Sequence, residues 1–348
     1  MLYYVFSDLH LHKFNDYSRA EGPYGNTRLE AQVNALNDIL KKASEETEEV
    51  TVLFLGDLYH QRGRVDTEVF NAGYKVFSNY PNIPIIIIEG NHDNVNNSIH
   101  SHSSLELYGL LPNVTLIREY EKLSLANGDT LVGVSYGEEY DELKAFIKDN
   151  TATILLAHLG VQGSRGAGQS KLDGPFTTGD LCVPNNYEIG LLGHYHNRQE
   201  LVPGVYYVGN PVAQNFGDSG EEKGYMTFET RENHVVDSSI SFHPLPYPMF
   251  IKVTNDNLDK YGTELEELAK NNFIRVVVDE KKFDMVKISG EEKDLPENLR
   301  IEKQLTPVSE TRIDISDIGS TLEIAKQWSD EFQPDNKDVI IKQLKKVI

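Results

Sequence analysis

The sequence has almost no cysteine and no long apolar run. The single cysteine, Cys182, among 348 residues excludes an internal disulfide framework and a thiolate-rich metal site. No apolar run approaches the ~18 residues of a membrane span, and the chain opens directly on MLYYVFSDLH without a charged leader. We therefore expect a soluble, unexported protein with no membrane association, located in the cytoplasm, or in the host cytoplasm if the source is viral. Any metal site must use oxygen and nitrogen ligands.

Basic residues are also scarce. The chain has 33 Lys and Arg against 54 Asp and Glu, which gives a formal net charge of −21. This balance favours solubility and argues against a large nonspecific basic surface for nucleic acid. Hydrophobic residues make up 39% of the chain, enough for a packed core, and a length of 348 residues predicts about two domains.

Short apolar segments bounded by turn residues predict buried strands. They lie at residues 2–6, 50–55, 83–88, 153–157 and 189–193. Residues 26–43, between the first two, carry apolar side chains on one helical face, and Thr27 with Glu30 forms a capping-box pattern. A second helix is predicted at residues 66–77. Strand, helix, strand, helix, strand is the order of an α/β domain.

Polar side chains follow every one of these strands. In chain order they are Asp8 and His10, Asp57 and His60, Asn91 and His92, His158, and His194 with His196. An isolated Asp-x-His is weak evidence, and a lone histidine after a strand is more often a hydrogen-bonded core residue. Chance is a poor explanation, however, for DxH, GDxxH, GNHD, H and GHxH in this order, because polar residues would have to fall independently at five strand ends. Because α/β sheets place their sites at the carboxyl ends of strands, we expect one shared cleft.

The motifs, which span residues 8–196, resemble those of the calcineurin-like metallophosphoesterases, and more narrowly the SbcD-type nuclease subunits of DNA double-strand-break repair. The similarity continues through YVGNPVAQNFGDSGEEKGY, and past about residue 245 no specific motif is present. The resemblance implies an α/β protein with a two-layered β-sandwich core flanked by helices. It also implies a small α+β capping domain and C-terminal helices.

The resemblance further implies two divalent metal ions with Asp57 as the bridging ligand. One ion would be held by Asp8, His10, Asp57 and His196, and the other by Asp57, Asn91, His158 and His194. Such a pair activates water and stabilises the attacking and leaving oxygens at phosphorus. Imidazole and carboxylate without thiolate suit manganese or iron, and zinc is also compatible. Manganese is the metal that the family favours.

Two further histidines are candidate catalytic residues. In the resembled family, His92 would face the scissile phosphate, where an imidazolium stabilises the transition state or protonates the leaving oxygen. His60 stands in GDLYHQRG, where phosphatases related to calcineurin have GDxxDRG. A second imidazole fits the nuclease branch, in which it helps to position the nucleotide. The alternative, a small-molecule phosphodiesterase or a protein or phosphomonoester phosphatase, stays open. His12 is interpreted as a rim or structural residue.

The resemblance implies a metal-dependent DNA exonuclease and endonuclease that processes double-strand breaks and acts in recombination. Candidate substrate-binding cations, which would make a local positive site, are Arg62, Arg64, Arg165 and Lys171. A solvated loop is an equally good interpretation of residues 159–172. Weak intrinsic DNA affinity would require a partner, by resemblance an SbcC-type ATPase of the ABC/SMC-like class. A homodimer is compatible with the resemblance.

Three regions are predicted. They are a nuclease domain at residues 1–245, a capping domain at 246–305, and a linker with partner-binding helices at 306–348. PLPYP at residues 244–248 is the best linker. The capping domain reads as a βαββ unit whose last strand is DMVKISG at residues 284–290. Two C-terminal helices, at 320–332 and 335–348, either dock the ATPase or pack on the capping domain.

Overall fold

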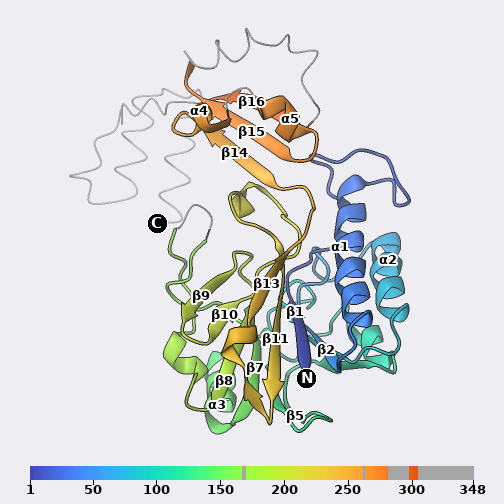
Figure 1. The fold of residues 1–348 in the computed structure, drawn as a ribbon, viewed down its shortest axis with the longest axis vertical. Helices are drawn as coiled ribbons and strands as arrows, with labels where there is room; N and C mark the ends of the chain where they lie inside the picture. Colours follow the sequence, from blue (N-terminus) through green and yellow to red (C-terminus); the bar gives the residue numbers. More distant parts are fainter. Residues whose placement is uncertain (167–169, 262–263, 281–297, 305–348) are drawn as a thin grey trace, which may run out of the picture. The chain divides into compact units, whose positions relative to one another are not determined.

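The computed structural model describes residues 1–166, 170–261, 264–280 and 298–304. These residues form a mixed α/β protein with three sheets, two of them large (Figure 1). The first large sheet has the strand order β12-β11-β1-β2-β3-β4, and β13 pairs with β11. Its strands are β1 (Leu2–Phe6), β2 (Val50–Phe54), β3 (Ile85–Ile88), β4 (Val114–Ile117), β11 (Gly224–Arg231), β12 (His234–Val235) and β13 (Ser241–Pro244). Strands β1 to β4 are parallel, and β11 is antiparallel to β1.

The second large sheet has the order β5-β6-β7-β8-β10-β9. Its strands are β5 (Tyr120–Ser124), β6 (Thr130–Val134), β7 (Ala152–His158), β8 (Tyr187–Gly193), β9 (Gln199–Val202) and β10 (Val205–Tyr207). The central strands β6, β7, β8 and β10 are parallel. The five predicted strands are therefore present as β1, β2, β3, β7 and β8, but they belong to two sheets.

The two large sheets pack face to face. One buried cluster joins Val5, Leu53 and Ile88 of the first sheet to Leu156 and Leu191 of the second. Alternate residues of the first sheet point the other way and pack against helices α1 (Thr27–Ser44) and α2 (Thr67–Ser78). The outer face of the second sheet is covered by α3 (Tyr140–Asp149). The expected two-layered β-sandwich flanked by helices is confirmed.

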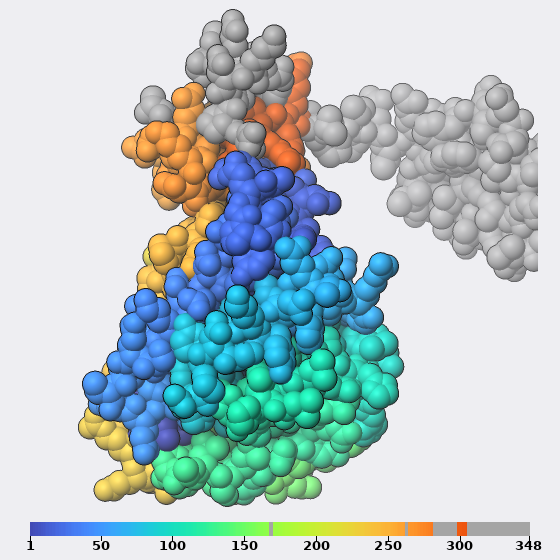
Figure 2. All heavy atoms as spheres, turned by 90° about the vertical axis from the view of Figure 1, so that its right-hand side faces the viewer, coloured from blue at the N-terminus to red at the C-terminus, as the bar shows by residue number. Residues whose placement is uncertain are grey.

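The two long predicted helices form, although the first begins differently from the prediction. The N-cap of α1 is Asn26, whose Oδ1 accepts a hydrogen bond from the backbone N–H of Leu29 at 2.9 Å. The capping box of Thr27 and Glu30 was therefore wrong, because Thr27 already lies inside the helix. In α2, Asp66 is the N-cap and accepts from two backbone N–H groups. Figure 2 shows the face that carries these helices, which is built from the N-terminal part of the chain.

A small third sheet follows the sandwich. It consists of the parallel strands β14 (Phe250–Thr254), β15 (Phe273–Val278) and β16 (Leu299–Lys303), with the short helices α4 (Leu258–Tyr261) and α5 (Leu265–Ala269). Strand β16 was not predicted. The strand expected at residues 284–290 and the two C-terminal helices lie outside the described residues.

Four short 3-10 helices lie in the described loops of the sandwich: η1 (Glu106–Leu110), η3 (Thr178–Leu181), η4 (Phe216–Asp218) and η5 (Asp237–Ser239). Of these, η4 belongs to the segment that follows GHxH and lies beside the candidate site. In the part of the chain that the structure describes, no helix has both the length and the apolar character needed to cross a membrane.

Candidate metal centre

The carboxyl ends of β1, β2, β3, β7 and β8 meet at one edge of the sandwich and bring the predicted ligands together. In the first group, Nε2 of His10 lies 3.1 Å from Nε2 of His196 and 3.5 Å from Oδ2 of Asp57. Asp8 Oδ1 lies 3.9 Å from Nε2 of His10 and 4.0 Å from Nε2 of His196. These four side chains point their ligand atoms at a common space.

A second group lies on the other side of Asp57. Oδ2 of Asp57 is 3.6 Å from Nε2 of His158. Oδ1 of Asn91 lies 3.2 Å from Nε2 of His158 and 2.9 Å from Nδ1 of His194. Asp57 Oδ2 therefore borders both groups, and the seven predicted ligands divide into two sets that share one carboxylate.

The backbone at these ligands is strained. Asp8, His10, Asp57 and His194 have φ angles of 55°, 51°, 59° and 99°. Non-glycine residues adopt such angles only where the surrounding structure holds them. Asp93 supplies much of that support, because its buried carboxylate accepts hydrogen bonds from the backbone N–H groups of Asp57, Leu58 and Gly90 at 2.7, 3.0 and 2.9 Å. Asp93 therefore fixes the two loops that carry Asp57 and Asn91.

The motif glycines are required by close approach. A Cβ at Gly90 would lie 2.1 Å from Oδ1 and 2.4 Å from the backbone nitrogen of Asp57. A Cβ at Gly193 would lie 2.3 Å from Oγ of Ser7 and 2.5 Å from the carbonyl oxygen of Leu55. Contacts under 3 Å of this kind cannot be tolerated, so only glycine lets the strand ends approach closely enough to share one site.

The electrostatics fit a site for divalent cations. Asp8 and Asp57 are 0% and 2% exposed, and no lysine or arginine pairs directly with either carboxylate among the described residues. Burial alone would lower the pKa of His158, but the Asp57 carboxylate beside it raises that pKa to about 9. Burial lowers the pKa of His10, and it lowers that of His194 to about 3, so these imidazoles are neutral and able to ligate.

Contacts behind the ligands orient them. Nδ1 of His158 donates to the carbonyl oxygen of Leu55 at 2.6 Å, which leaves Nε2 facing the centre. Nδ1 of His196 lies 3.2 Å from Oδ1 of Asp218, a buried carboxylate. A histidine ligand commonly donates its second N–H to a carbonyl or carboxylate in this way. The donor set, its burial and these contacts fit a pair of divalent metals bound by oxygen and nitrogen.

His92 and His60 lie beside the first ligand group. The His92 ring is 4.7 Å from that of His10 and 5.5 Å from that of His60, nearly parallel to the latter. Nδ1 of His92 donates to the backbone carbonyl oxygen of His60 at 2.5 Å, which leaves Nε2 for another partner. The backbone N–H of His92 donates to Oδ1 of Asp57 at 2.7 Å. His92 is therefore held next to the candidate centre by hydrogen bonds from both its ring and its backbone N–H.

The four candidate substrate-binding cations lie on two loops, outside the lining of the cavity at the centre. Arg62 and Arg64 are exposed on the loop after β2, and Arg62 donates to the side chain of Asn97. Arg165 and Lys171 are exposed and face each other across an isolated antiparallel bridge in the loop after β7. None of these four side chains lines the cavity that adjoins the centre.

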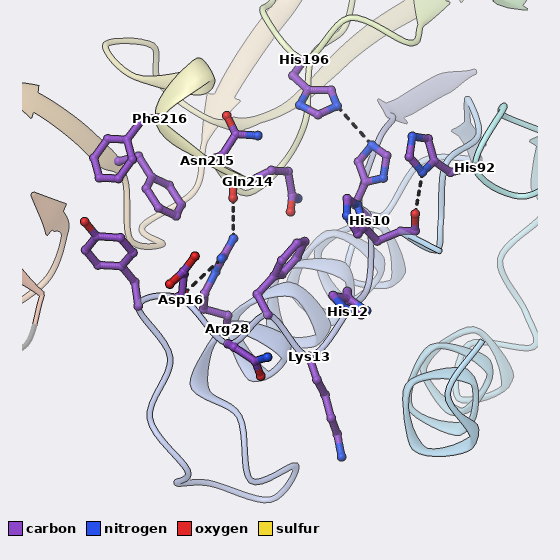
Figure 3. Close-up of a pocket in the computed structure, with 15 residues that line it drawn as sticks. His10, His12, Lys13, Asp16, Arg28, His92, His196, Gln214, Asn215 and Phe216 are labelled. Atoms are coloured by element: carbon purple, nitrogen blue, oxygen red, sulfur yellow. Dashed lines mark hydrogen bonds between the residues drawn. The ribbon is translucent and has the colours of Figure 1, made fainter. Parts of the chain in front are cut away.

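That cavity has a volume of about 500 Å³ and opens beside the first ligand group (Figure 3). His10, His92 and His196 form one side, and His12 and His60 also line it. The lining also contains residues that sequence reasoning missed, namely Phe14, Tyr17, Arg28, Gln214, Phe216 and Phe250. Asp218 was missed as well, although it lies in the GNPVAQNFGDSGEEKGY segment whose similarity was noted.

The fold and the site define a hydrolase of phosphate esters. The model of the calcineurin-like phosphoesterase family matches residues 1–198, and the chain belongs to that family. The matched region contains all seven predicted ligands together with His60 and His92. Members of the family use divalent metals, and the clustered Asp and His side chains described above are groups that could hold them.

Two curated relatives extend the comparison. The chain is 24% identical over 272 residues to exonuclease subunit 1 of Enterobacteria phage T4. This alignment covers 69% of this chain and 76% of that protein. The chain is 22% identical over 280 residues to the SbcD subunit of the nuclease SbcCD of Staphylococcus saprophyticus, covering 72% and 73%. Both relatives carry names of nuclease subunits.

Two solved structures are also similar. NAD nucleotidase of Haemophilus influenzae aligns with a TM-score of 0.38 and 13% identity over 83% of this chain. The 5′-nucleotidase precursor of Thermus thermophilus aligns with a TM-score of 0.34 and 12% identity over 70% of this chain. The chain spans 59% and 54% of the lengths of these two proteins.

Proposed function

We propose that this protein is a two-metal phosphodiesterase that cleaves DNA as an exonuclease and endonuclease, in the processing of double-strand breaks and in recombination. The observation that carries the proposal is the pair of ligand groups on either side of Asp57, with Oδ2 at 3.5 Å from His10 and 3.6 Å from His158. A carboxylate shared in this way suits two neighbouring divalent ions. The names of the two nuclease relatives support DNA as the substrate.

The geometry supports the proposed division of labour among the site residues. Asp8, His10, Asp57 and His196 hold one metal, and Asp57, Asn91, His158 and His194 hold the other. When bound, the two ions supply an activated water and positive charge at the phosphorus. His92, oriented by the His60 carbonyl, directs Nε2 at the phosphate and stabilises charge or protonates the leaving oxygen. Manganese is the proposed metal, because imidazole and carboxylate ligands suit it better than magnesium.

His60 favours a nuclease over the second candidate function, a small-molecule phosphodiesterase or phosphomonoesterase. Its ring lies parallel to that of His92 with 19° between the planes, and it lines the cavity. A second imidazole there can contact the second ester group of a diester, which a monoester lacks. We propose that His60 positions the nucleotide on one side of the scissile bond. Arg62, Arg64, Arg165 and Lys171 are proposed as outlying backbone contacts, since none lines the cavity.

The test is an assay of the purified protein with manganese on four substrates. They are blunt double-stranded DNA ends, a single-stranded hairpin, a chromogenic phosphodiester and a chromogenic phosphomonoester. The proposal predicts cleavage of both DNA substrates and of the diester, with little release from the monoester. Preferential hydrolysis of the monoester would instead establish a phosphatase and would contradict the nuclease proposal.

We further propose a capping domain at residues 246–305 and a partner-docking region at 306–348. Phe250 of β14 lines the cavity, which supports a role for the small sheet at the substrate. The partner would be an SbcC-type ATPase that supplies the basic surface absent from a chain of net charge −21. Both relatives are named as subunits, one of them of SbcCD, which supports this. A homodimer remains a prediction.

Deletion of residues 319–348 tests the docking role. The truncated protein should remain folded and active in manganese but should no longer co-purify with the ATPase. If these residues instead pack on the capping domain, deletion removes buried apolar side chains worth ~3 kcal/mol or more and lowers the melting temperature by several degrees. Early melting together with retained ATPase binding would rule out docking.

A further inference from the structure

The cavity beside the candidate centre is lined by two chemically different kinds of side chain. One side carries the imidazoles of His10, His92 and His196, which would face a bound phosphate. Three phenylalanines from separate parts of the chain, Phe14, Phe216 and Phe250, also line the cavity, and Figure 3 shows Phe216 at the end opposite His92. A phosphodiester held at the centre would extend at least one of its ester groups into this space. These aromatic rings are therefore placed to contact that group.

The ring of Phe14 is held by a buried cation. The guanidinium carbon of Arg28 lies 4.0 Å from the Phe14 ring centroid, which is a cation–π contact. Arg28 is 7% exposed and donates to the backbone carbonyl oxygens of Asp16 and Gln214 at 3.2 and 2.5 Å. Among the described residues, no carboxylate lies within 4.0 Å of this guanidinium in an ion pair. Its position is thus fixed by main-chain acceptors, and its guanidinium supports one face of the ring.

Phe14 also lies close to the catalytic candidates. Its ring centroid is 4.9 Å from that of His60 and 4.9 Å from that of His12. His60 is in turn 5.5 Å from His92, so Phe14 lies one ring away from the residue proposed to face the scissile phosphate. Phe14 is half-buried, and part of its surface lines the cavity. The Phe14 ring is therefore close enough to the proposed position of the scissile phosphate to contact the adjacent nucleotide.

The end of the cavity is closed by a second aromatic group. Phe216 of η4 lies 4.9 Å from Phe250, which in turn lies 4.8 Å from Phe273 of β15. Tyr17 packs edge-on against Phe216 at 5.5 Å. Such interlocked rings form a rigid apolar wall. A volume of about 500 Å³ between this wall and the imidazoles falls within the usual range for a small-ligand site.

We propose that Phe14, supported by Arg28, forms a stacking platform for an unpaired nucleobase of a DNA strand, in the nucleotide next to the scissile phosphate, with Phe216 and Phe250 closing the subsite. The inference rests on the proposed nuclease function and adds the recognition of the base. Stacking on an aromatic face tolerates every base, so the subsite favours unpaired bases without reading sequence. A base within a duplex must leave its stack to reach the ring. The subsite therefore favours frayed or single-stranded ends.

Two chromogenic diesters with one leaving group test the platform. They are thymidine 5′-(4-nitrophenyl phosphate), which carries a nucleoside, and methyl 4-nitrophenyl phosphate, which does not. Phe14→Leu should lower the ratio of kcat/KM for the nucleoside ester to that for the methyl ester roughly 5- to 150-fold, mainly through KM. Phe14→Tyr, which keeps an aromatic face, should restore the ratio. An unchanged ratio in a Phe14→Leu protein that hydrolyses both esters would overturn the subsite.

A binding measurement covers the case in which the leucine variant fails to fold. Phe14→Trp places an indole at the platform of a chain that otherwise has one tryptophan. Addition of an oligothymidylate to this variant, prepared without metal, should quench its fluorescence, and the wild-type protein serves as the control for the native tryptophan. Quenching no greater than in the wild type would overturn the proposal. Failure of the nuclease function is distinguished by the wild-type protein, which would then leave DNA ends intact while cleaving the methyl ester.

Discussion

Asp218 Oδ1 lies 3.2 Å from Nδ1 of His196, although the two residues are 22 positions apart in the chain. The Asp218 carboxylate also accepts from the backbone N–H of Gln214 at 2.7 Å and from Nδ2 of Asn210 at 3.1 Å. Lys223 Nζ lies 4.0 Å away and donates to the carbonyl oxygen of His196. These contacts, foremost the hydrogen bond with His196, hold the pKa of Asp218 below its usual range despite burial. Asp218 is a positioning residue for a candidate metal ligand.

Asp218→Asn should therefore weaken metal binding without removing a ligand. Loss of an outer carboxylate of this type typically reduces metal affinity roughly 10- to 100-fold. We expect isothermal titration with manganese to show one weakened and one nearly unaffected site. Glu222→Gln, which neutralises a nearby exposed carboxylate, is the control and should bind like the wild type. Wild-type affinity at both sites in Asp218→Asn would show that the contact is merely structural.

Activity should depend strictly on metal. Treatment with a chelator followed by dialysis should abolish hydrolysis of the chromogenic diester, because the two proposed ions supply both the activated water and the positive charge at phosphorus. Manganese should restore the rate better than magnesium, since four of the seven proposed ligands are imidazoles, to which magnesium is poorly suited. Full activity in excess chelator would contradict the two-metal proposal.

Substitutions of Asp57 and of His92 should impair activity in different ways. Asp57→Asn removes the shared carboxylate and should impair the binding of both ions. His92→Ala leaves all seven proposed ligands in place and should retain the metals while kcat falls by roughly 100-fold or more, as for a removed acid catalyst. Metal content per chain and kcat, measured on the same preparations, separate the two roles. A metal-free His92→Ala protein would mean that our assignment is wrong.

His60→Ala should discriminate between substrates. The His60 ring lies between Phe14 and His92, at 4.9 and 5.5 Å, and is proposed to position the nucleotide. We expect the variant to lose about tenfold or more in kcat/KM on DNA ends and clearly less on methyl 4-nitrophenyl phosphate. His100→Ala, at an exposed histidine paired with Glu119, is the matched control. Equal losses on both substrates would favour the small-molecule phosphodiesterase.

Gly90→Ala should destabilise the protein at the centre. The new methyl group would lie 2.1 Å from Oδ1 of Asp57, and relieving such overpacking costs about 1–3 kcal/mol or more. Calorimetry should show a melting temperature lowered by several degrees, together with weaker manganese binding. Gly179→Ala is the matched control, because the nearest atom to its new methyl group is 3.7 Å away. A Gly90→Ala protein that melts like the control would show that the strand ends can separate.

The amino-acid sequence determined the local structure well. The apolar runs at β1, β2, β3, β7 and β8 are strands because short, β-branched, continuously buried segments favour that conformation over others. Polar side chains follow each of these strands in the sequence, after a glycine at β2, β3 and β8, and so lie at strand ends whatever the surrounding fold. The predicted start of α1 was wrong by one position. Asn26 and Thr27 are both good caps, and the extended backbone of Asn26, φ −159° and ψ 108°, decides between them.

Tertiary structure decided which of these strand ends share a site. His10 and His196 are 186 residues apart, and their Nε2 atoms come within 3.1 Å because two separate sheets pack with their carboxyl ends at one edge. No local sequence pattern predicts how the two sheets pack. The contacts of Asp218 with His196, and of Arg28 in α1 with Phe14, depend likewise on how the loops beside the site pack. A sequence fixes the residues available for a ligand or a ring contact, whereas distances between them follow from the packing of the whole core.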